Sequence, residues 1–202
     1  MKVSLTDAGK RYNRDWIFRH LQYTFEQGKS YAITGPNGSG KSTLLQVISG
    51  AVGVNEGKIS WTSVPETPTS NLISLAAPYL EVIEEMTALE FLAFHSVFKP
   101  FRPGVTHTQI LQRVGLESAA DKQIRNFSSG MKQRIKLAQA FYSDVPILLL
   151  DEPCTNLDAA GIAIYQELIK EMTADRLVIV SSNDEVEYGF CGERVELMKY
   201  KS

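Results

Sequence analysis

Long apolar stretches are absent from this sequence of 202 residues. No run approaches the roughly 18 to 20 uninterrupted apolar residues that are needed to span a bilayer. Residues 1–7 also lack the apolar core of a signal peptide. We therefore expect any membrane work to be done through a partner.

An excess of basic charge is also missing. The 21 Lys and Arg residues stand against 23 Asp and Glu residues, for a net charge of -2, so a nucleic acid is not expected as the main partner. Cys154 and Cys191 show no paired spacing, which fits a reducing cytoplasm, and we expect Cys154 to be a small buried hydrophobe. His20, His95 and His107 have no metal-ligand spacing and are assigned to surface or packing.

The chain instead offers apolar segments that alternate with helical patterns. Residues 30–34 form an expected strand that runs into a glycine-rich loop, followed by a helix over residues 41–49 that Gly50 ends. The apolar runs 147–150 and 177–180 are typical of central strands that are buried on both faces. This order predicts one α/β domain with a mostly parallel sheet flanked by helices.

Two additions to this core are predicted. Residues 78–134 are more helical, with helix candidates at 88–94 and 110–114 and a break at 100–103. We expect them to form a helical subdomain, with residues 1–77 and 135–202 as the α/β core. Residues 3–5 and 59–61 are expected to be antiparallel edge strands.

The glycine-rich loop matches the phosphate-binding pattern G-x-x-x-x-G-K-S. Its backbone N–H groups would surround the phosphates at a helix N-terminus, Lys41 would add positive charge, and the Ser42 hydroxyl would bind Mg²⁺. The alternative is a glycine-rich turn with an incidental Lys-Ser pair, but the strand-to-helix context favours ATP binding. The predicted nucleotide-binding residues are Gly35, Pro36, Asn37, Gly38, Ser39, Gly40, Lys41, Ser42 and Thr43.

Two carboxylates follow the strand at 147–150. Asp151 would stand at the carboxyl end of the strand and hold Mg²⁺, while Glu152 would act as general base toward the attacking water. The alternative is that both residues only cap the following turn.

A serine-led helix precedes this strand. Ser128 is an expected N-cap for a helix with an apolar stripe at Met131, Ile135, Ala138 and Phe141. Its solvent-exposed side would carry Lys132, Arg134 and Lys136. Because Phe127-Ser128-Ser129-Gly130-Met131 stands about twenty residues before Asp151-Glu152-Pro153, the sequence resembles the ABC (ATP-binding cassette) ATPase family, whose signature usually reads Leu-Ser-Gly-Gly-Gln.

The resemblance covers essentially the whole chain and adds roles to several residues. It implies that Ser128, Ser129, Gly130 and Met131 bind the γ-phosphate of an ATP held by a second copy. It implies that Asp158 lies in the loop that crosses the dimer interface, although Asp158 is also an expected helix N-cap. Tyr12 resembles the aromatic residue that stacks on adenine, with Trp16 as the rival.

The sequence departs from the family pattern at two positions. The expected Gln falls on Pro78, and the expected switch His falls on Asn183. Asn183 keeps an N–H donor but cannot carry a positive charge. Loss of one preorganised donor can cost about 10²- to 10³-fold in rate, so we expect intact Mg·ATP binding, slow hydrolysis and a partial contribution from Asn183.

The resemblance implies the cytoplasmic ATPase subunit of a transporter, similar to small bacterial export cassettes such as the haem-exporter kind. Such a subunit works as a dimer around two Mg·ATP, at the inner membrane, bound to a transmembrane permease subunit. The alternatives are a soluble ABC-type ATPase that acts on ribosomes or DNA, and an ATP-dependent regulatory switch with negligible turnover. The sequence does not specify the transported substrate or the direction of transport.

Overall fold

A five-stranded parallel sheet forms the centre of the computed structural model, which describes residues 1–62 and 68–201. The strand order is β5-β6-β7-β3-β8, and every neighbouring pair is parallel. Every residue of β6 and β7 is buried, as predicted for central strands. The bounds are β3 Ser30–Thr34, β5 Ile73–Ala76, β6 Ile147–Asp151, β7 Leu177–Ser181 and β8 Glu193–Glu196.

The N-terminal part of the chain forms a second, antiparallel sheet, which packs against α1 (Lys41–Ile48). It contains β1 (Lys2–Tyr12), β2 (Asp15–Glu26) and β4 (Glu56–Thr62) in the order β2-β1-β4. Val3 pairs with Trp61 and Leu5 pairs with Ile59. The predicted antiparallel edge is therefore confirmed.

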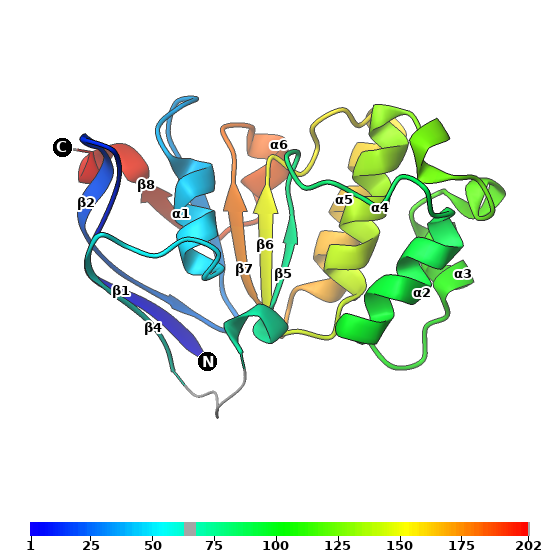
Figure 1. Ribbon diagram of the computed structural model, residues 1–202, viewed down its shortest axis with the longest axis horizontal. Coiled ribbons are helices and arrows are strands. Elements are labelled where there is room, and N and C mark those ends of the chain that lie inside the picture. The colour runs from blue at the N-terminus through cyan, green and yellow to red at the C-terminus, as the bar shows by residue number, and fades with distance from the viewer. Residues whose placement is uncertain (63–67, 202) are drawn as a thin grey trace.

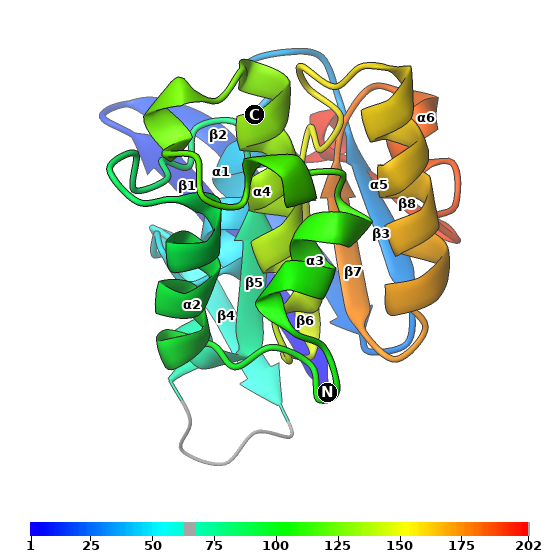
Figure 2. The same ribbon diagram turned by 90° about the vertical axis from the view of Figure 1, so that its right-hand side faces the viewer.

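Helices cover both faces of the parallel sheet (Figure 1). Helix α1 lies between the two sheets, α4 and α5 cover the opposite face, and α2 and α3 form the outermost layer at the far end, which Figure 2 shows from that side. The helices are α1 Lys41–Ile48, α2 Ala88–Phe98, α3 His107–Arg113, α4 Ser129–Tyr142, α5 Ala159–Met172 and α6 Glu185–Tyr188, and the short 3₁₀ helices are η1 Thr69–Leu72, η2 Glu117–Ala119, η3 Ile124–Asn126 and η4 Leu197–Tyr200.

The core has two parts because each parallel strand presents alternate side chains to opposite faces. In β6, Ile147 and Leu149 pack with α1 and the antiparallel sheet. Leu148 and Leu150 pack with the helices on the other face. The two hydrophobic clusters thus pack on opposite faces of the parallel sheet, and this packing fixes the positions of the strand ends.

The helical segment predicted over residues 78–134 contains α2 and α3. Thr87 starts α2 with a capping box, in which its hydroxyl accepts from the Glu90 amide and the Glu90 carboxylate accepts from the Thr87 amide. Helix α4 runs through residues 134 and 135, where the helical subdomain was predicted to end. The division of the chain into a core and a helical subdomain stays a prediction.

Helix α4 corrects one expectation. The stripe residues Ile135, Ala138 and Phe141 are buried as predicted, but Lys136 is only 8% exposed and does not lie on a wet side. Its ammonium donates to the carbonyls of Ala77 (3.4 Å) and Pro78 (2.9 Å). The prediction was wrong because a loop covers this side of the helix, and its carbonyls require a buried donor.

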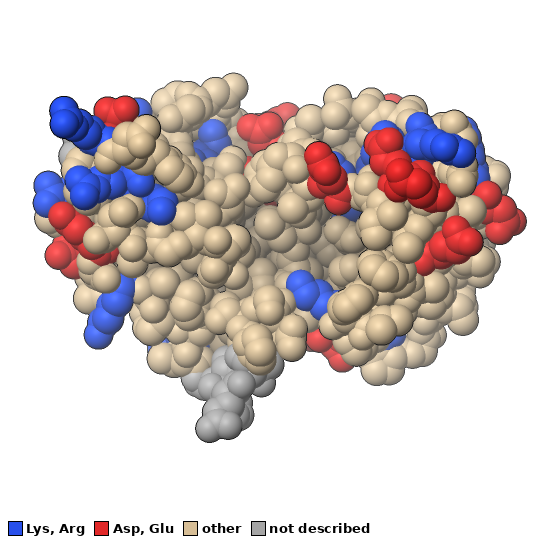
Figure 3. All heavy atoms as spheres, viewed as in Figure 1, with Lys and Arg blue, Asp and Glu red and all other residues tan. Residues whose placement is uncertain are grey.

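No helix in residues 1–62 and 68–201 is long and apolar enough to cross a membrane. Both signs of charge occur on the face drawn in Figure 3, with basic side chains most numerous over the end formed by β1 and β2.

Candidate nucleotide site

The candidate site begins at the carboxyl ends of three neighbouring strands. In the sheet register, Ile33 of β3 lies beside Ser181 of β7, and Ser181 lies beside Asp151 of β6. Ligand sites in open parallel sheets lie at this edge. The fold thus brings the loop after β3 and the carboxylates after β6 to one place.

The loop between β3 and α1 is shaped by close contacts. Gly40 is the N-cap of α1 with φ of 101°, and a Cβ there would lie 2.0 Å from Cγ2 of Ile17. The Ser39 amide donates to the Pro36 carbonyl at 3.0 Å. Lys41 is buried inside the loop, where its ammonium donates to the Gly35 carbonyl at 2.8 Å.

These residues fit a polyphosphate. The Ser39 hydroxyl is buried and has no hydrogen-bond partner among the residues that the structure describes, which leaves a donor for an incoming group. The loop ends at the N-terminus of α1, and Lys41 is the first residue of that helix. A helix N-terminus with a lysine beside it is an arrangement that binds anions.

Asp151 is 2% exposed and faces the hydroxyls of Ser42 and Ser181. Burial raises the pKa of Asp151, while these hydroxyls and the nearby Lys41 charge act in the opposite direction. A hydroxyl and a carboxylate beside a phosphate loop are the donor set that Mg²⁺ takes, together with phosphate oxygens and water. In the part of the chain that the structure describes, no cluster of three or more His, Cys, Asp or Glu side chains could hold a metal ion by itself.

Glu152 follows in a left-handed backbone conformation, with φ of 42°. It lines a cavity of about 290 Å³ together with Asn37 and Asn183. The Asn183 amide oxygen accepts from the Gly35 amide at 3.2 Å, and its Nδ2 donates to Oδ1 of Asn37 at 3.3 Å. The structure thus brings Glu152, Asn183 and the phosphate loop together.

The serine-led helix forms a separate groove of about 340 Å³. Ser128 is exposed, and its hydroxyl accepts from the Met131 amide at 3.2 Å as the N-cap of α4. A Cβ on Gly130 would lie 2.9 Å from the carbonyl oxygen of Asn156, so only glycine fits there without movement. The groove is lined by Ser128, Ser129, Gly130, Met131, Arg134, Asn156 and Asp158.

Asp158 lies at the edge of this groove. Its carboxylate accepts from the Gly161 amide at 2.8 Å, which makes it the N-cap of α5, and it pairs with Arg134 at 2.5 Å. Figure 1 places the N-terminus of α4 at the same end of the molecule as the phosphate loop but well to its side. The two predicted halves of the site therefore do not meet within the chain.

Comparison with known protein families matches residues 18–155 to the family described as ABC transporter. The chain belongs to the ABC transporter family. It is an ATP-binding subunit of the ABC type with an ATPase domain. The predicted family and fold are confirmed.

Two relatives illustrate the similarity. The cytochrome c biogenesis ATP-binding export protein CcmA of Xylella fastidiosa is 33% identical over 158 residues, which are 76% of this chain and 70% of that protein. An uncharacterized ABC transporter ATP-binding protein of Bacillus subtilis, YybJ, is 29% identical over 185 residues, which are 90% of this chain and 85% of that protein.

Solved cassettes share the fold. A putative ABC transporter ATP-binding protein from Pyrococcus furiosus has a TM-score of 0.82 at 24% identity, with full coverage of both chains. The cassette MJ0796, solved as a dimer bound to ADP and Pi, has a TM-score of 0.81 at 24% identity and covers 96% of this chain and 94% of that one.

The loop after β5 contains one of the two positions, Pro78, where the sequence departs from the family pattern. Pro78 is exposed, and the next residue, Tyr79, lies near Asp151 and the Gln46 side chain. Burial and the Asp151 charge raise the pKa of Tyr79 to about 12, so the phenol keeps its proton. The sequence analysis missed Tyr79, and its only signal was an aromatic residue directly after the expected Gln position.

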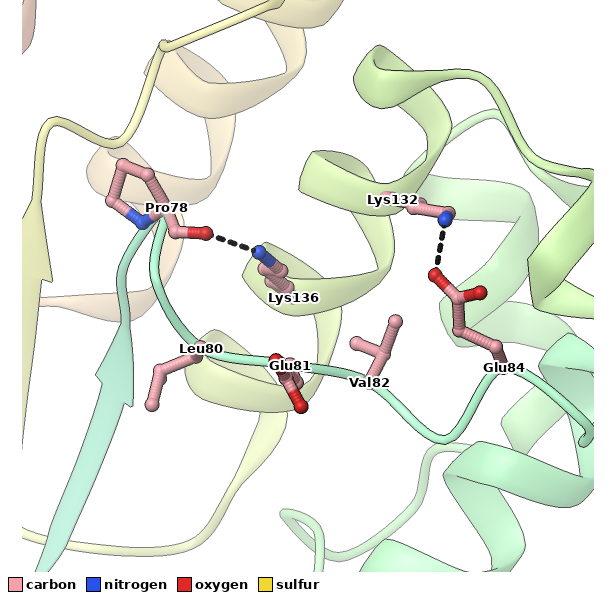
Figure 4. Close-up of a pocket in the computed structure, with 7 residues that line it drawn as sticks. All are labelled: Pro78, Leu80, Glu81, Val82, Glu84, Lys132 and Lys136. Carbon is pink, nitrogen blue, oxygen red and sulfur yellow. Dashed lines mark hydrogen bonds and ion pairs between the residues drawn. The ribbon is translucent and has the colours of Figure 1, made fainter.

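The loop also borders a cleft of about 360 Å³ against α4 (Figure 4). Lys136 reaches the Pro78 carbonyl, and Lys132 pairs with Glu84 further along the loop. Leu80, Glu81 and Val82 line the remaining wall. Two lysines one helical turn apart on α4 therefore bind two points of one loop.

Two aromatic residues compete for the predicted adenine contact. Tyr12 is 46% exposed and has the Lys10 ammonium 5.1 Å from its ring centroid. Trp16 is half-buried, with the guanidinium groups of Arg11 and Arg19 at 5.4 Å and 4.7 Å. Tyr12 has the more accessible ring, and its role in adenine stacking stays a prediction.

Cys154 lies partly buried beside this site. Burial and the charges of Glu187 and Asp184 raise the pKa of its thiol to about 12. The thiol therefore stays protonated, which agrees with a packing role.

Proposed function

We propose that this cassette pairs with a second copy of itself around two Mg·ATP and drives a membrane-spanning export subunit. The observation that carries the proposal is the separation of the two half-sites. Lys41 and Asp151 lie at the sheet edge, whereas Ser128 and Gly130 form an outward-facing groove that has no phosphate loop of its own. A second copy would bring each groove to the other copy's phosphate loop.

Each residue has a chemical task in this proposal. Lys41 and the loop amides bind the β- and γ-phosphates, and Ser42 and Asp151 hold Mg²⁺, which neutralises phosphate charge when bound. Glu152 accepts a proton from the water that attacks the γ-phosphorus, and ADP leaves with the electrons of the broken P–O bond. Asn183 donates its amide N–H to the developing charge in place of a cationic side chain.

The Glu152→Gln variant tests the two-copy site. With Mg·ATP it should elute in size-exclusion chromatography with light scattering at twice the 22.5 kDa of one chain, because ATP stays bound when the base is lost. Its phosphate release should fall by about 10²- to 10⁴-fold.

Two controls separate the half-sites. Lys41→Ala should bind ATP weakly and stay at the mass of one chain. Ser128→Arg places a large cation in an exposed groove, so it should bind ATP normally but fail to dimerise. A Glu152→Gln protein that binds ATP saturably but keeps the mass of one chain would contradict the two-copy site.

We expect slow turnover because Asn183 stands where the family has a histidine. Asn183→Ala should lower kcat further, since the amide contacts with Gly35 and Asn37 would also be lost. Brisk turnover that Asn183→Ala leaves untouched would refute this role. Phosphate release that does not depend on Glu152 would instead favour the regulatory-switch alternative.

The membrane partner is proposed to bind at the cleft between α4 and the loop after β5, which would place the cassette at the cytoplasmic face of the membrane. Apolar Leu80 and Val82 stand there beside charged Glu81 and Lys136. CcmA carries an export function in its name, and we extend that direction of transport to this cassette. A photo-crosslinking residue at Leu80 should capture a membrane-spanning protein, and the same residue at exposed Lys58 should not.

A further inference from the structure

The turn after β6 carries Glu152 in a conformation that the backbone does not favour. Glu152 has φ of 42° and Asn156 has φ of 65°, both in the left-handed region. This region is unfavourable for residues that carry a Cβ atom, because Cβ comes too close to the following carbonyl oxygen. Such conformations persist only where surrounding groups hold them.

Three consecutive residues of this turn make hydrogen bonds to three different parts of the chain. The Glu152 amide donates to the Ser181 carbonyl at 2.9 Å. The Pro153 carbonyl accepts from the Gln133 side chain at 2.8 Å, and the Cys154 amide donates to the Glu187 carboxylate at 2.6 Å. Of these contacts, only the one to Glu187 uses a buried carboxylate.

Glu187 belongs to α6, which begins two residues after Asn183. Its side chain is 4% exposed and lines the same cavity as Glu152 and Asn183. The Ser182 hydroxyl faces its carboxyl group, and its backbone carbonyl accepts from the Tyr165 hydroxyl at 2.6 Å. The side chain thus connects the turn that holds Asn183 with the turn that holds Glu152.

Packing alone does not account for a carboxyl group at this place. Removal of a carboxylate from water carries a large free-energy cost unless hydrogen bonds compensate it, and burial raises the pKa of Glu187 accordingly. Its Oε1 atom satisfies the Cys154 amide, two residues from the proposed base.

We propose that Glu187 is a positioning residue that holds the Glu152 turn in its left-handed conformation and ties it to the Asn183 turn. The inference rests on the proposed ATPase function. Glu187 does not touch the reacting atoms. It fixes the direction in which the Glu152 carboxylate leaves the backbone, and therefore its placement beside Asn183.

Hydrogen exchange of the nucleotide-free chain tests the contact first. In Glu187→Ala, exchange at the Cys154 amide should rise by about tenfold or more, while amides in β6 keep their protection. Glu187→Gln retains an acceptor oxygen and should preserve most of the protection. Glu185→Ala changes an exposed residue of the same helix and should leave the exchange unchanged.

Kinetics then distinguish positioning from stability. Glu187→Ala should lower kcat by about 10- to 100-fold and change ATP affinity by less than about twofold, whereas Glu187→Gln should recover most of kcat. Thermal unfolding shows whether Glu187→Ala folds. If it does not, the comparison of Glu187→Gln with wild type decides. A Glu187→Gln variant as slow as Glu152→Gln would overturn the proposal.

The two proposals fail in different ways. Active wild-type protein with an equally active, folded Glu187→Ala variant would overturn the positioning role alone. Loss of kcat and of ATP affinity in equal measure would also overturn it, because the effect would then be general. Wild-type protein without Glu152-dependent phosphate release would overturn the proposed ATPase function itself.

Discussion

His95 should make the stability of this protein sensitive to mild acid. Ser143 donates its hydroxyl hydrogen to the Gln139 carbonyl at 2.6 Å, so its oxygen must accept from Nε2 of His95 at 3.0 Å. The ring stacks on Phe101 with 5.5 Å between ring centroids. Burial and the nearby Lys99 charge lower the pKa of His95 to about 4, so the folded protein holds the neutral ring.

The sign and size follow from proton linkage. An unfolded histidine takes up a proton below about pH 6.5, whereas His95 in the folded protein resists it until about pH 4. Its contribution to stability is therefore complete above pH 6.5 and is lost as the pH falls from 6.5 to 4. Since pH 5 lies about 1.5 units below the unfolded pKa, and each unit corresponds to about 1.4 kcal/mol, the loss of stability at pH 5 is about 2 kcal/mol.

Urea unfolding at pH 7.5 and pH 5.0 measures this loss. The free energy of unfolding of wild-type protein should fall by about 2 kcal/mol more than that of His95→Gln, which keeps a polar side chain but does not titrate. In a thermal scan this corresponds to about 4–8 °C for a chain of this size.

His20→Gln is the matched control, because His20 is exposed and lies on the antiparallel sheet. It should retain the pH dependence of the wild type. An equal change with pH in wild type and His95→Gln would refute the neutral, half-buried ring.

Three substitutions test the loop, the cleft and a helix cap. Gly40→Ala places a methyl group 2.0 Å from Ile17 and should weaken binding of a fluorescent ATP analogue at least tenfold. Gly53→Ala adds its methyl group in open space and should leave binding unchanged. Equal affinities of the two variants would contradict the loop geometry. Lys136→Met removes the donor to the Pro78 carbonyl and should lower the free energy of unfolding by about 1–2 kcal/mol, so unchanged urea stability would argue against that contact. Thr87→Ala should cost about 1 kcal/mol in the same assay, and a neutral result would show that the capping box contributes little.

The central sheet and the phosphate loop were predictable because their signals are local. Residues 147–150 form an apolar run of the length of a buried strand, and a run of this kind can be buried on both faces only between other strands. The glycines and Lys41 stand in a fixed order between a strand and a helix. Periodicity and spacing alone therefore placed β3, α1, β6 and β7.

The contacts of Lys136, Glu187 and Tyr79 could not be predicted in the same way. Each polar group depends on a partner far along the chain, at separations of 58 residues for Lys136 and Pro78 and 33 for Glu187 and Cys154. A helical pattern places Lys136 next to other charged residues and therefore in water. Only the packing of the loop after β5 against α4 reveals the carbonyls that the ammonium satisfies.

These contacts also bear on how the loop after β5 can move. Pro78 has no side-chain donor or acceptor, so the loop's polar contact with α4 at this point is made by its backbone carbonyl. Since Lys132 and Lys136 bind the loop at Glu84 and Pro78, a shift of the loop must either break both contacts or carry α4 with it. Ser128 caps the same N-terminal part of α4 that carries these two lysines, so the cleft proposed for the membrane subunit is mechanically joined to the groove proposed for the second copy's ATP.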